Sequence, residues 1–182
     1  MHANIYVMTD KENAKTSAEA RAFAFGYLQQ QGFAGEGTRF SCPIADWFVV
    51  GGRWSGEFTK QTLDKDKIQA FEKEFEKKYG YWINKSVSQD DRRKQSEKLF
   101  KEYFPDFDGK MPYWRNNYNE MGADDDAVIV NNAIYTKIVK AGMKNGIEDG
   151  GAVVDTNGWD VCNMKKKDIV GKKWIVVVDF HS

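Results

Sequence analysis

The feature that most constrains this chain is an eleven-residue segment, 46–56, that reads Asp-Trp-Phe-Val-Val-Gly-Gly-Arg-Trp-Ser-Gly. Its aromatic and β-branched residues predict a buried strand. Because apolar and polar residues do not alternate across 47–50, we expect this strand to be covered on both faces. The pair Gly51-Gly52 can adopt positive φ at little steric cost, so the sequence predicts a tight turn directly after the strand.

Arg53 and Trp54 follow this turn and allow two interpretations. As a binding site, Arg53 would offer a planar fork of donors to a carboxylate, a phosphate or a base, and Trp54 would stack on the ligand. As a structural element, Arg53 would pair with Asp46, and the indoles of Trp47 and Trp54 would fill the core. Neither Gly-x-x-x-x-Gly-Lys-[Ser/Thr] nor Gly-x-Gly-x-x-Gly occurs. We favour the structural interpretation and expect Trp54 to pack back over the sheet.

Hydrophobic periodicity and turn residues predict the elements of the first two thirds of the chain. A strand at 4–8 is followed by a helix that begins at the capping box Thr16-x-x-Glu19 and ends at Gly32. An extended segment follows at 38–42. Helices are predicted between 60 and 103, the second of which begins at Ser88-x-x-Asp91, and an irregular aromatic linker occupies 105–123.

The last third of the chain carries one ambiguous and two clear patterns. The i+4 spacing of Val130, Ile134 and Ile138 after the acidic run 124–126 favours a helix from 127 to about Lys140, with a β-strand as the competitor. Asn157-Gly158 between two apolar runs predicts a hairpin. The run 174–180 predicts a central strand. Strands at both ends with helices between them indicate an α+β class.

We therefore expect one α+β domain over residues 1–182, built on a mainly antiparallel sheet. A helical excursion at about 60–104 would be inserted between the strands, within an insertion that extends to about residue 123.

Charge and hydropathy limit the classes of function. Lys+Arg and Asp+Glu number 27 each, and this neutral balance is not that of a strongly basic nucleic-acid binder. The basic runs 92–94 and 165–173, the second of which begins with Lys165, Lys166 and Lys167, could contact nucleic acid or an acidic protein. A solvated face is the favoured interpretation of both runs. Mean hydropathy is −0.66, and no apolar run approaches the ~20 residues of a membrane span. The first residues show no secretory leader pattern, so we expect a cytoplasmic protein.

Candidate reactive groups are few. Cys42 and Cys162 lack metal spacing, and we expect reduced, partly buried thiols. Asp179 and His181 share one face of the last strand and could bind a metal or act as an acid–base pair, but no third ligand is identifiable. The acidic run 124–126 with Glu120 lacks the pattern of a calcium loop, and helix capping is the favoured interpretation. The sequence predicts no catalytic set, metal or cofactor, and indicates no oligomeric state.

A resemblance rests on residues 46–48, residues 51–56 and the ending Val178-Asp179-Phe180-His181. These resemble a group of proteins of bacteriophages and mobile elements, in which a Trp/Asp-rich strand leads into Gly-Gly-Arg-Trp. An acidic helix start, a Gly-Trp hairpin and a terminal Val-Asp-x-His strand follow. Residues 60–123 lie outside the resemblance. Phe180 replaces the group's usual cysteine, which weakens the case for an Asp-Cys-His cluster.

No activity comes with that group. The resemblance implies a non-enzymatic accessory protein that binds and disables host defence machinery, as anti-CRISPR inhibitors do. Its partner would be a host protein such as an RNA-guided nuclease, with nucleic acid contacted through the basic patches. The alternative is a small nucleotide- or metal-binding enzyme whose site joins the Gly-Gly-Arg-Trp turn to Asp179 and His181.

Overall fold

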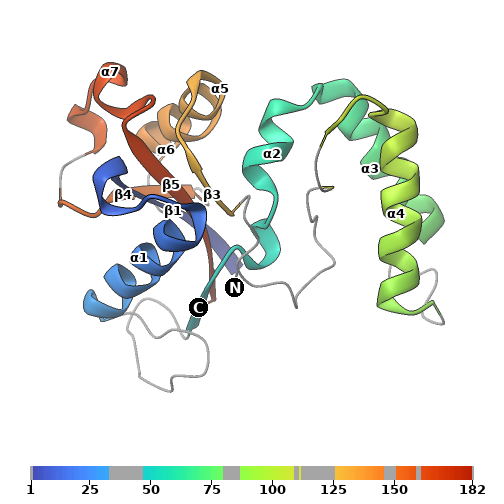
Figure 1. Ribbon diagram of the computed structural model, residues 1–182, viewed down its shortest axis with the longest axis horizontal. Helices are drawn as coiled ribbons and strands as arrows, with labels where there is room; N and C mark the ends of the chain where they lie inside the picture. Colours follow the sequence, from blue (N-terminus) through green and yellow to red (C-terminus); the bar gives the residue numbers. More distant parts are fainter. Residues whose placement is uncertain are drawn as a thin grey trace. The chain divides into compact units, whose positions relative to one another are not determined.

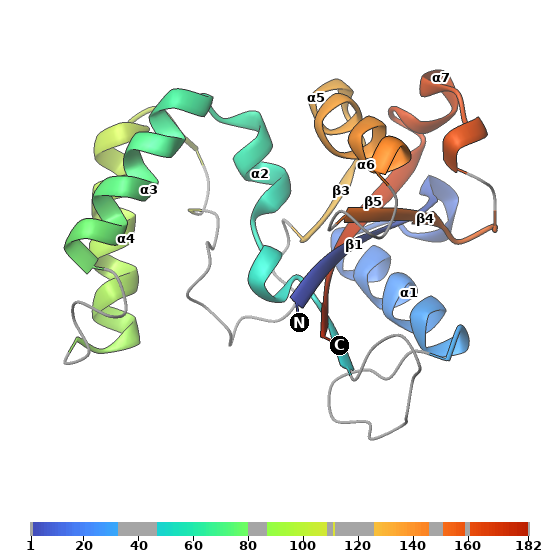
Figure 2. The ribbon, with the colours of Figure 1, turned by 180° about the vertical axis from the view of Figure 1, so that it is seen from behind.

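The α+β class is confirmed by the structure, a computed structural model that describes residues 2–32, 47–79, 87–108, 111, 126–145, 151–158 and 161–181. The chain divides into two compact units. The first comprises Met1–Gln61 and Tyr113–Ser182, and the second comprises Thr62–Pro112. Figures 1 and 2 show the sheet in the first unit and a pair of long helices in the second.

The sheet of the first unit is mixed but mainly antiparallel, as expected. Its strands are β1 (His2–Asp10), β2 (Trp47–Val50), β3 (Ala127–Ile129), β4 (Gly151–Asp155) and β5 (Lys173–His181). The order is β2-β5-β1-β4, and β3 also pairs with β5. The pair β1–β4 is parallel, whereas β5 runs antiparallel to β1, β2 and β3. The predicted central position of the last strand is confirmed.

Strands β2 and β3 lie one after the other along the same edge of β5. Val50 pairs with Val178, whereas Ala127 pairs with Val176, and β1 occupies the other edge of β5. Between the two strands, Gly51 N donates to the carbonyl oxygen of Val177 at 2.8 Å. The Gly51-Gly52 turn therefore sits where β2 leaves the sheet and β3 continues its edge.

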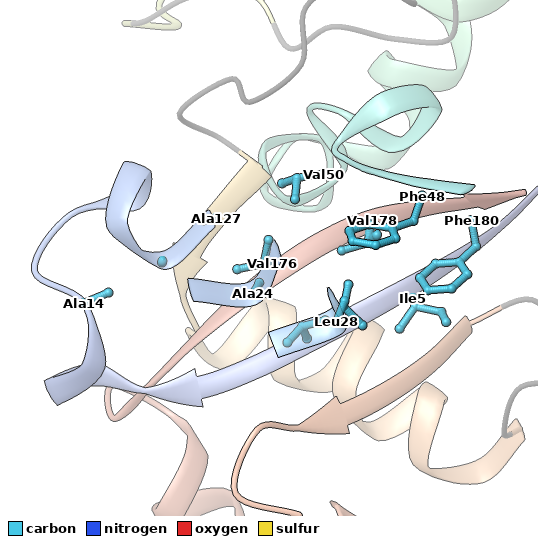
Figure 3. Close-up of a cluster of buried hydrophobic side chains, with 12 residues drawn as sticks. Ile5, Ala14, Ala24, Leu28, Phe48, Val50, Ala127, Val176, Val178 and Phe180 are labelled. Carbon is cyan, nitrogen blue, oxygen red and sulfur yellow. The ribbon is translucent and has the colours of Figure 1, made fainter. Parts of the chain in front are cut away.

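Helices cover both faces of this sheet. Helix α1 (Ser17–Gln30) packs on one face through Ala20, Ala24 and Leu28, which meet alternate residues of β1 and β5 (Figure 3). The other face is covered by α2 (Glu57–Thr62), α5 (Asn132–Ile134), the π-helical turn Tyr135–Val139, α6 (Lys140–Asn145) and α7 (Lys166–Ile169). Phe48 of β2 stacks on Phe180 of β5 on one face, with ring centroids 5.7 Å apart. Val49, which alternates to the other face, is buried as well, so β2 is covered on both faces as predicted.

The predicted start and end of α1 are confirmed. The side chain of Thr16 accepts a hydrogen bond from Glu19 N, which satisfies one free donor of the first turn. The Glu19 carboxylate accepts in return from the backbone of Lys15 at 2.6 Å. Gly32 adopts a φ of +85°, a conformation that a side chain disfavours.

The prediction of a helix from residue 127 is wrong for its first turn. Ala127–Ile129 forms β3, because its β-branched residues complete the open edge of β5. The helix begins instead at Asn132, where the side chain of Asn131 accepts from Ile134 N at 2.9 Å. Asp126 therefore directly precedes a strand, and the N-cap of the helix that follows is Asn131.

The prediction of a hairpin at Asn157-Gly158 is also wrong. The turn is present, with Gly158 at a φ of +74°, but β4 pairs in parallel with β1. Beyond the turn the chain enters the 3₁₀ helix Val161–Asn163, whose Val161 is buried. Carboxylates hold this turn in place of a facing strand, since Asn157 N donates to Asp155 and Asn157 Nδ2 donates to Asp10.

The second unit is a pair of helices, α3 (Lys65–Tyr79) and α4 (Gln89–Tyr103). The side chain of Ser88 accepts from Asp91 N, which confirms the predicted start of α4. Phe71 meets Phe100 edge-to-face at 5.6 Å in its core. Within the run 92–94, Arg92 is buried and donates to the carbonyl oxygen of Tyr79, Arg93 pairs with Glu97, and Lys94 is exposed.

Several predictions lie outside the described residues, namely those for Cys42, the segment 38–42, most of the linker 105–123 and the acids Glu120, Asp124 and Asp125. Cys162 is described and is exposed, not partly buried, because it lies on a short 3₁₀ helix at the surface. No helix among the described residues is long and apolar enough to cross a membrane.

Candidate functional site

The Gly51-Gly52 turn is pressed against two carboxylates. Gly51 and Gly52 have φ values of +79° and +56°. A Cβ atom added to Gly51 would lie 2.1 Å from Oδ2 of Asp126, and one added to Gly52 would lie 2.6 Å from Cβ of Asp179. Both glycines are therefore required by close approach as well as by backbone conformation.

Three segments that are distant in the sequence meet at this turn. Asp126 comes from the start of β3 and Asp179 from β5, where it pairs with Val49 of β2. The exposed fractions of Asp126 and Asp179 are 0% and 2%. The turn meets the last strand at Asp179, whereas the side chain of Arg53, on which the alternative ligand site also depends, lies outside the described residues. Asp126 was missed as a site residue because its acidic run favours a helix start; the β-branched residues after it were the available signal.

Asp179 belongs to a buried polar group of side chains that continues on β1, on the same face of the sheet as Asp179. Asn4 of β1 pairs with Asp179, and its Nδ2 donates to the hydroxyl of Tyr6 at 2.8 Å. Burial raises the pKa of Tyr6, and the charge of Glu57 raises it further against the opposing bond from Asn4. Burial and the charge of Glu57 therefore both favour the neutral phenol.

Three atoms around this polar group are buried without a hydrogen-bond partner: Asn4 Oδ1, Trp54 Nε1 and Ser55 Oγ. An unpaired buried polar atom typically costs about 1–3 kcal/mol, so each such atom calls for a physical explanation. Asn4 Oδ1 is a hydrogen-bond acceptor, Trp54 Nε1 is a donor, and Ser55 Oγ can act as either. Within the described ranges, no group of three His, Cys, Asp or Glu residues is placed to hold a metal.

The indole of Trp54 packs back over the sheet, as predicted. It is half-buried and lies against the apolar cluster that includes Tyr6, Phe58 and Val177. Trp54 thus joins the turn to the core, although part of its ring stays accessible to solvent.

Trp54→Ala is expected to lower the free energy of unfolding by about 2 kcal/mol, roughly half the cost of truncating a fully buried aromatic residue. Trp54→Phe should be close to neutral, because it keeps an aromatic ring and removes the unpartnered Nε1–H. Urea denaturation of both variants measures the two effects. Equal losses in the two variants would show that the indole nitrogen has a stabilising partner.

The remaining predicted residues of the motif are described only in part. Asp46 and the side chains of Trp47 and Arg53 lie outside the described residues. His181 is the last residue of β5 and is half-buried, on the same face of the strand as Asp179.

The lysines of the second basic run divide into two kinds. Lys165, Lys166 and Lys167 are exposed at the start of α7. Lys173, which the sequence placed in the same basic run, has instead an exposed fraction of only 4%. Its side chain points inward and meets Asp10 at the end of β1 and Asp155 at the end of β4.

Lys173 is the centre of a charged network at the ends of the parallel strands β1 and β4. Its Nζ donates to Oδ1 of Asp10 at 2.7 Å and to Oδ2 of Asp155 at 2.6 Å. Burial acts against the ammonium charge, but the bonds to Asp10 and Asp155 prevail and raise the pKa of Lys173. The bond from Lys173 lowers the pKa of Asp10 against partial burial, and Asn157 adds to this effect. The network joins three strands of the sheet.

No protein-family model, curated protein sequence or solved structure matches this chain. The functional argument therefore rests on the geometry of the Gly51-Gly52 turn, the buried polar group and the exposed lysines.

Proposed function

We propose that this chain is a non-enzymatic binding protein, an accessory protein of a phage or mobile element that docks on a host defence nuclease in the manner of an anti-CRISPR inhibitor. The observation that carries the proposal is the contrast between the motif and α7. The carboxylates of Asp126 and Asp179 are covered by the protein's own turn, whereas Lys165, Lys166 and Lys167 face solvent.

The close contacts at the turn support a structural role for the motif. The backbone of Gly51 fills the side of Asp126 that faces it, and that of Gly52 does the same at Asp179. Carboxylates so enclosed are not exposed to a partner, whereas docking uses side chains that reach solvent. The resemblance to proteins of phages and mobile elements makes a nuclease of host defence the first partner to test.

The test is capture of the guide-loaded RNA-guided nuclease of a host by the purified, immobilised chain, followed by a DNA cleavage assay. We expect a complex and slower cleavage as the chain is titrated in. The Lys165→Gln, Lys166→Gln, Lys167→Gln triple variant should weaken both effects. Failure to retain the nuclease, together with unchanged cleavage, would contradict the proposal.

A second candidate, a small ligand-binding enzyme, is favoured by one specific observation. Gly52 contacts Asp179, and the unpartnered atoms of Asn4, Trp54 and Ser55 lie in the neighbouring elements. Thermal-shift measurements with ATP, GTP, Mg²⁺ and Mn²⁺ test it. A ligand present at 100 times its dissociation constant adds about 2.7 kcal/mol to stability. A shift that Ser55→Ala abolishes would support the enzyme; no shift with any of the four would exclude these as its ligands.

A further inference from the structure

Apart from α2, which carries the half-buried Glu57, the helical layer over the second face of the sheet is strongly basic, although the whole chain is neutral. This part of the layer, described at 126–145 and 161–172, contains a single exposed acid, Asp168. The lysines whose side chains are exposed there are Lys137, Lys140, Lys165, Lys166, Lys167 and Lys172. Positive charge is therefore concentrated on this layer, which is the electrostatic pattern of a polyanion-binding surface.

Tertiary packing gathers these lysines, which come from two parts of the chain. Ile134 and Ile138 of the first part and Ile169 of α7 belong to one buried cluster. Lys166 Nζ lies 5.6 Å from the centroid of the Tyr135 ring, so the first turn of α7 contacts the π-helical turn. Figure 2 shows α5, α6 and α7 on the same side of the sheet.

The acids at the adjoining strand ends do not cancel this charge. Asp155 is buried and bonded to Lys173, and Asp10 is bonded to the same ammonium group. Lys137 donates to the carbonyl oxygen of Gln61, so its ammonium is anchored at the margin of the layer. The other five lysines carry the accessible positive charge.

We infer that this lysine layer binds the phosphate backbone of a nucleic acid. Lysine is depleted at protein–protein interfaces, which are anchored by aromatic residues and arginine. The layer has no arginine in its described parts, and Phe23, the large apolar side chain that is exposed among the described residues, lies on α1 beneath the opposite face. Lysines act as point charges toward phosphates and need no directional match.

This inference deepens the proposed function by naming the chemistry of the partner, and it rests on that function's claim that the chain acts by binding. The nucleic acid would be the guide or target strand held by the nuclease. Backbone contact implies binding without sequence preference and with a strong dependence on salt.

The experiment is fluorescence anisotropy of a labelled DNA duplex, and of the matching RNA duplex, titrated with the full chain over a series of salt concentrations. We expect the logarithm of the association constant to fall linearly with the logarithm of salt. The Lys165→Gln, Lys166→Gln, Lys167→Gln variant should bind more weakly and lose about one unit of slope for each phosphate contact removed.

A matched control removes the same charge from the second unit. Lys65, Lys67 and Lys73 of α3 are exposed, and their triple glutamine variant should bind as the wild type does. Equal weakening in both triple variants, or no binding of either duplex at low salt, would overturn the inference. Competition by poly-glutamate as effective as that by unlabelled duplex would overturn it as well. If the nuclease is still captured while both duplexes fail to bind, only this inference falls and the proposed function stands.

Discussion

Gly52→Ala is expected to destabilise the first unit by about 2–5 kcal/mol, the sum of two known costs. A side chain at positive φ costs about 1–2 kcal/mol, and an added methyl group in a packed site typically costs about 1–3 kcal/mol. The new Cβ would meet Asp179 Cβ at 2.6 Å and Val49 Cγ1 at 2.8 Å, and both neighbours are held in strands. Urea denaturation followed by circular dichroism measures the change.

Gly158→Ala is the control that separates backbone conformation from packing. Gly158 has a φ of +74°, and a Cβ there would meet nothing within 4 Å. Gly158→Ala should therefore lower the free energy of unfolding only by the cost of a side chain at positive φ, about 1–2 kcal/mol. If both glycine variants lose the same stability, the turn does not press on Asp179.

Lys173→Met is expected to cost about 3–5 kcal/mol, because it leaves the carboxylate of Asp155 buried without its cation. The side chain of Asp155 has an exposed fraction of 0%, so water cannot replace the ammonium group. Lys172→Met is the matched control, since its side chain is exposed and should change stability by less than about 0.5 kcal/mol. Similar losses for the two variants would contradict the network.

The network around Lys173 also determines how the stability of the fold changes as the pH falls. The pKa of Asp10 is lower in the folded chain than its ordinary value of 3.8, chiefly through the bond from Lys173. The unfolded state therefore binds the proton more readily. The stabilisation that the ionised Asp10 contributes is complete above pH 3.8. It is lost as the pH falls through the lower pKa that Asp10 has in the folded chain. Denaturation midpoints of wild type and Lys173→Met should converge as the pH falls through this range; a gap that stays constant would contradict the assignment.

Local patterns predicted the elements that local chemistry determines. Thr16 with Glu19, and Ser88 with Asp91, mark helix starts because the capping groups lie within one turn of each other. The strand at 47–50 and its glycine turn followed from the same kind of information, as did the central last strand. In each case the residues that decide the structure are neighbours in the sequence.

Pairings between distant segments were not predictable in this way. The segment at 127–129 follows an acidic run and precedes a helical spacing, but it pairs with the open edge of β5 beyond Gly51 and forms β3. Asn157-Gly158 makes its turn, yet β4 joins β1 in parallel, so the turn opens no hairpin. In both cases the strand partner is distant in the sequence, and local residues do not identify it.

Two functional features depend on the same distant pairings. Asp126 reaches the Gly51-Gly52 turn only because β3 follows β2 along one edge of β5. Lys173 belongs to a basic run in the sequence and becomes buried because Asp10 and Asp155 end the two neighbouring strands. The exposure of Lys165, Lys166 and Lys167, in contrast, followed from the charge run itself.

Amide hydrogen exchange tests most directly whether the glycine turn belongs to the core while the lysine layer meets the partner. Exchange is measured for the chain alone and for the chain in its complex with the guide-loaded nuclease. We expect slow exchange at Gly51 N, which donates to Val177, in both states. Binding should slow exchange at 132–145 and 161–172 and leave 47–58 unchanged. Fast exchange at Gly51 in the free chain, or new protection at 51–55 in the complex, would contradict the account.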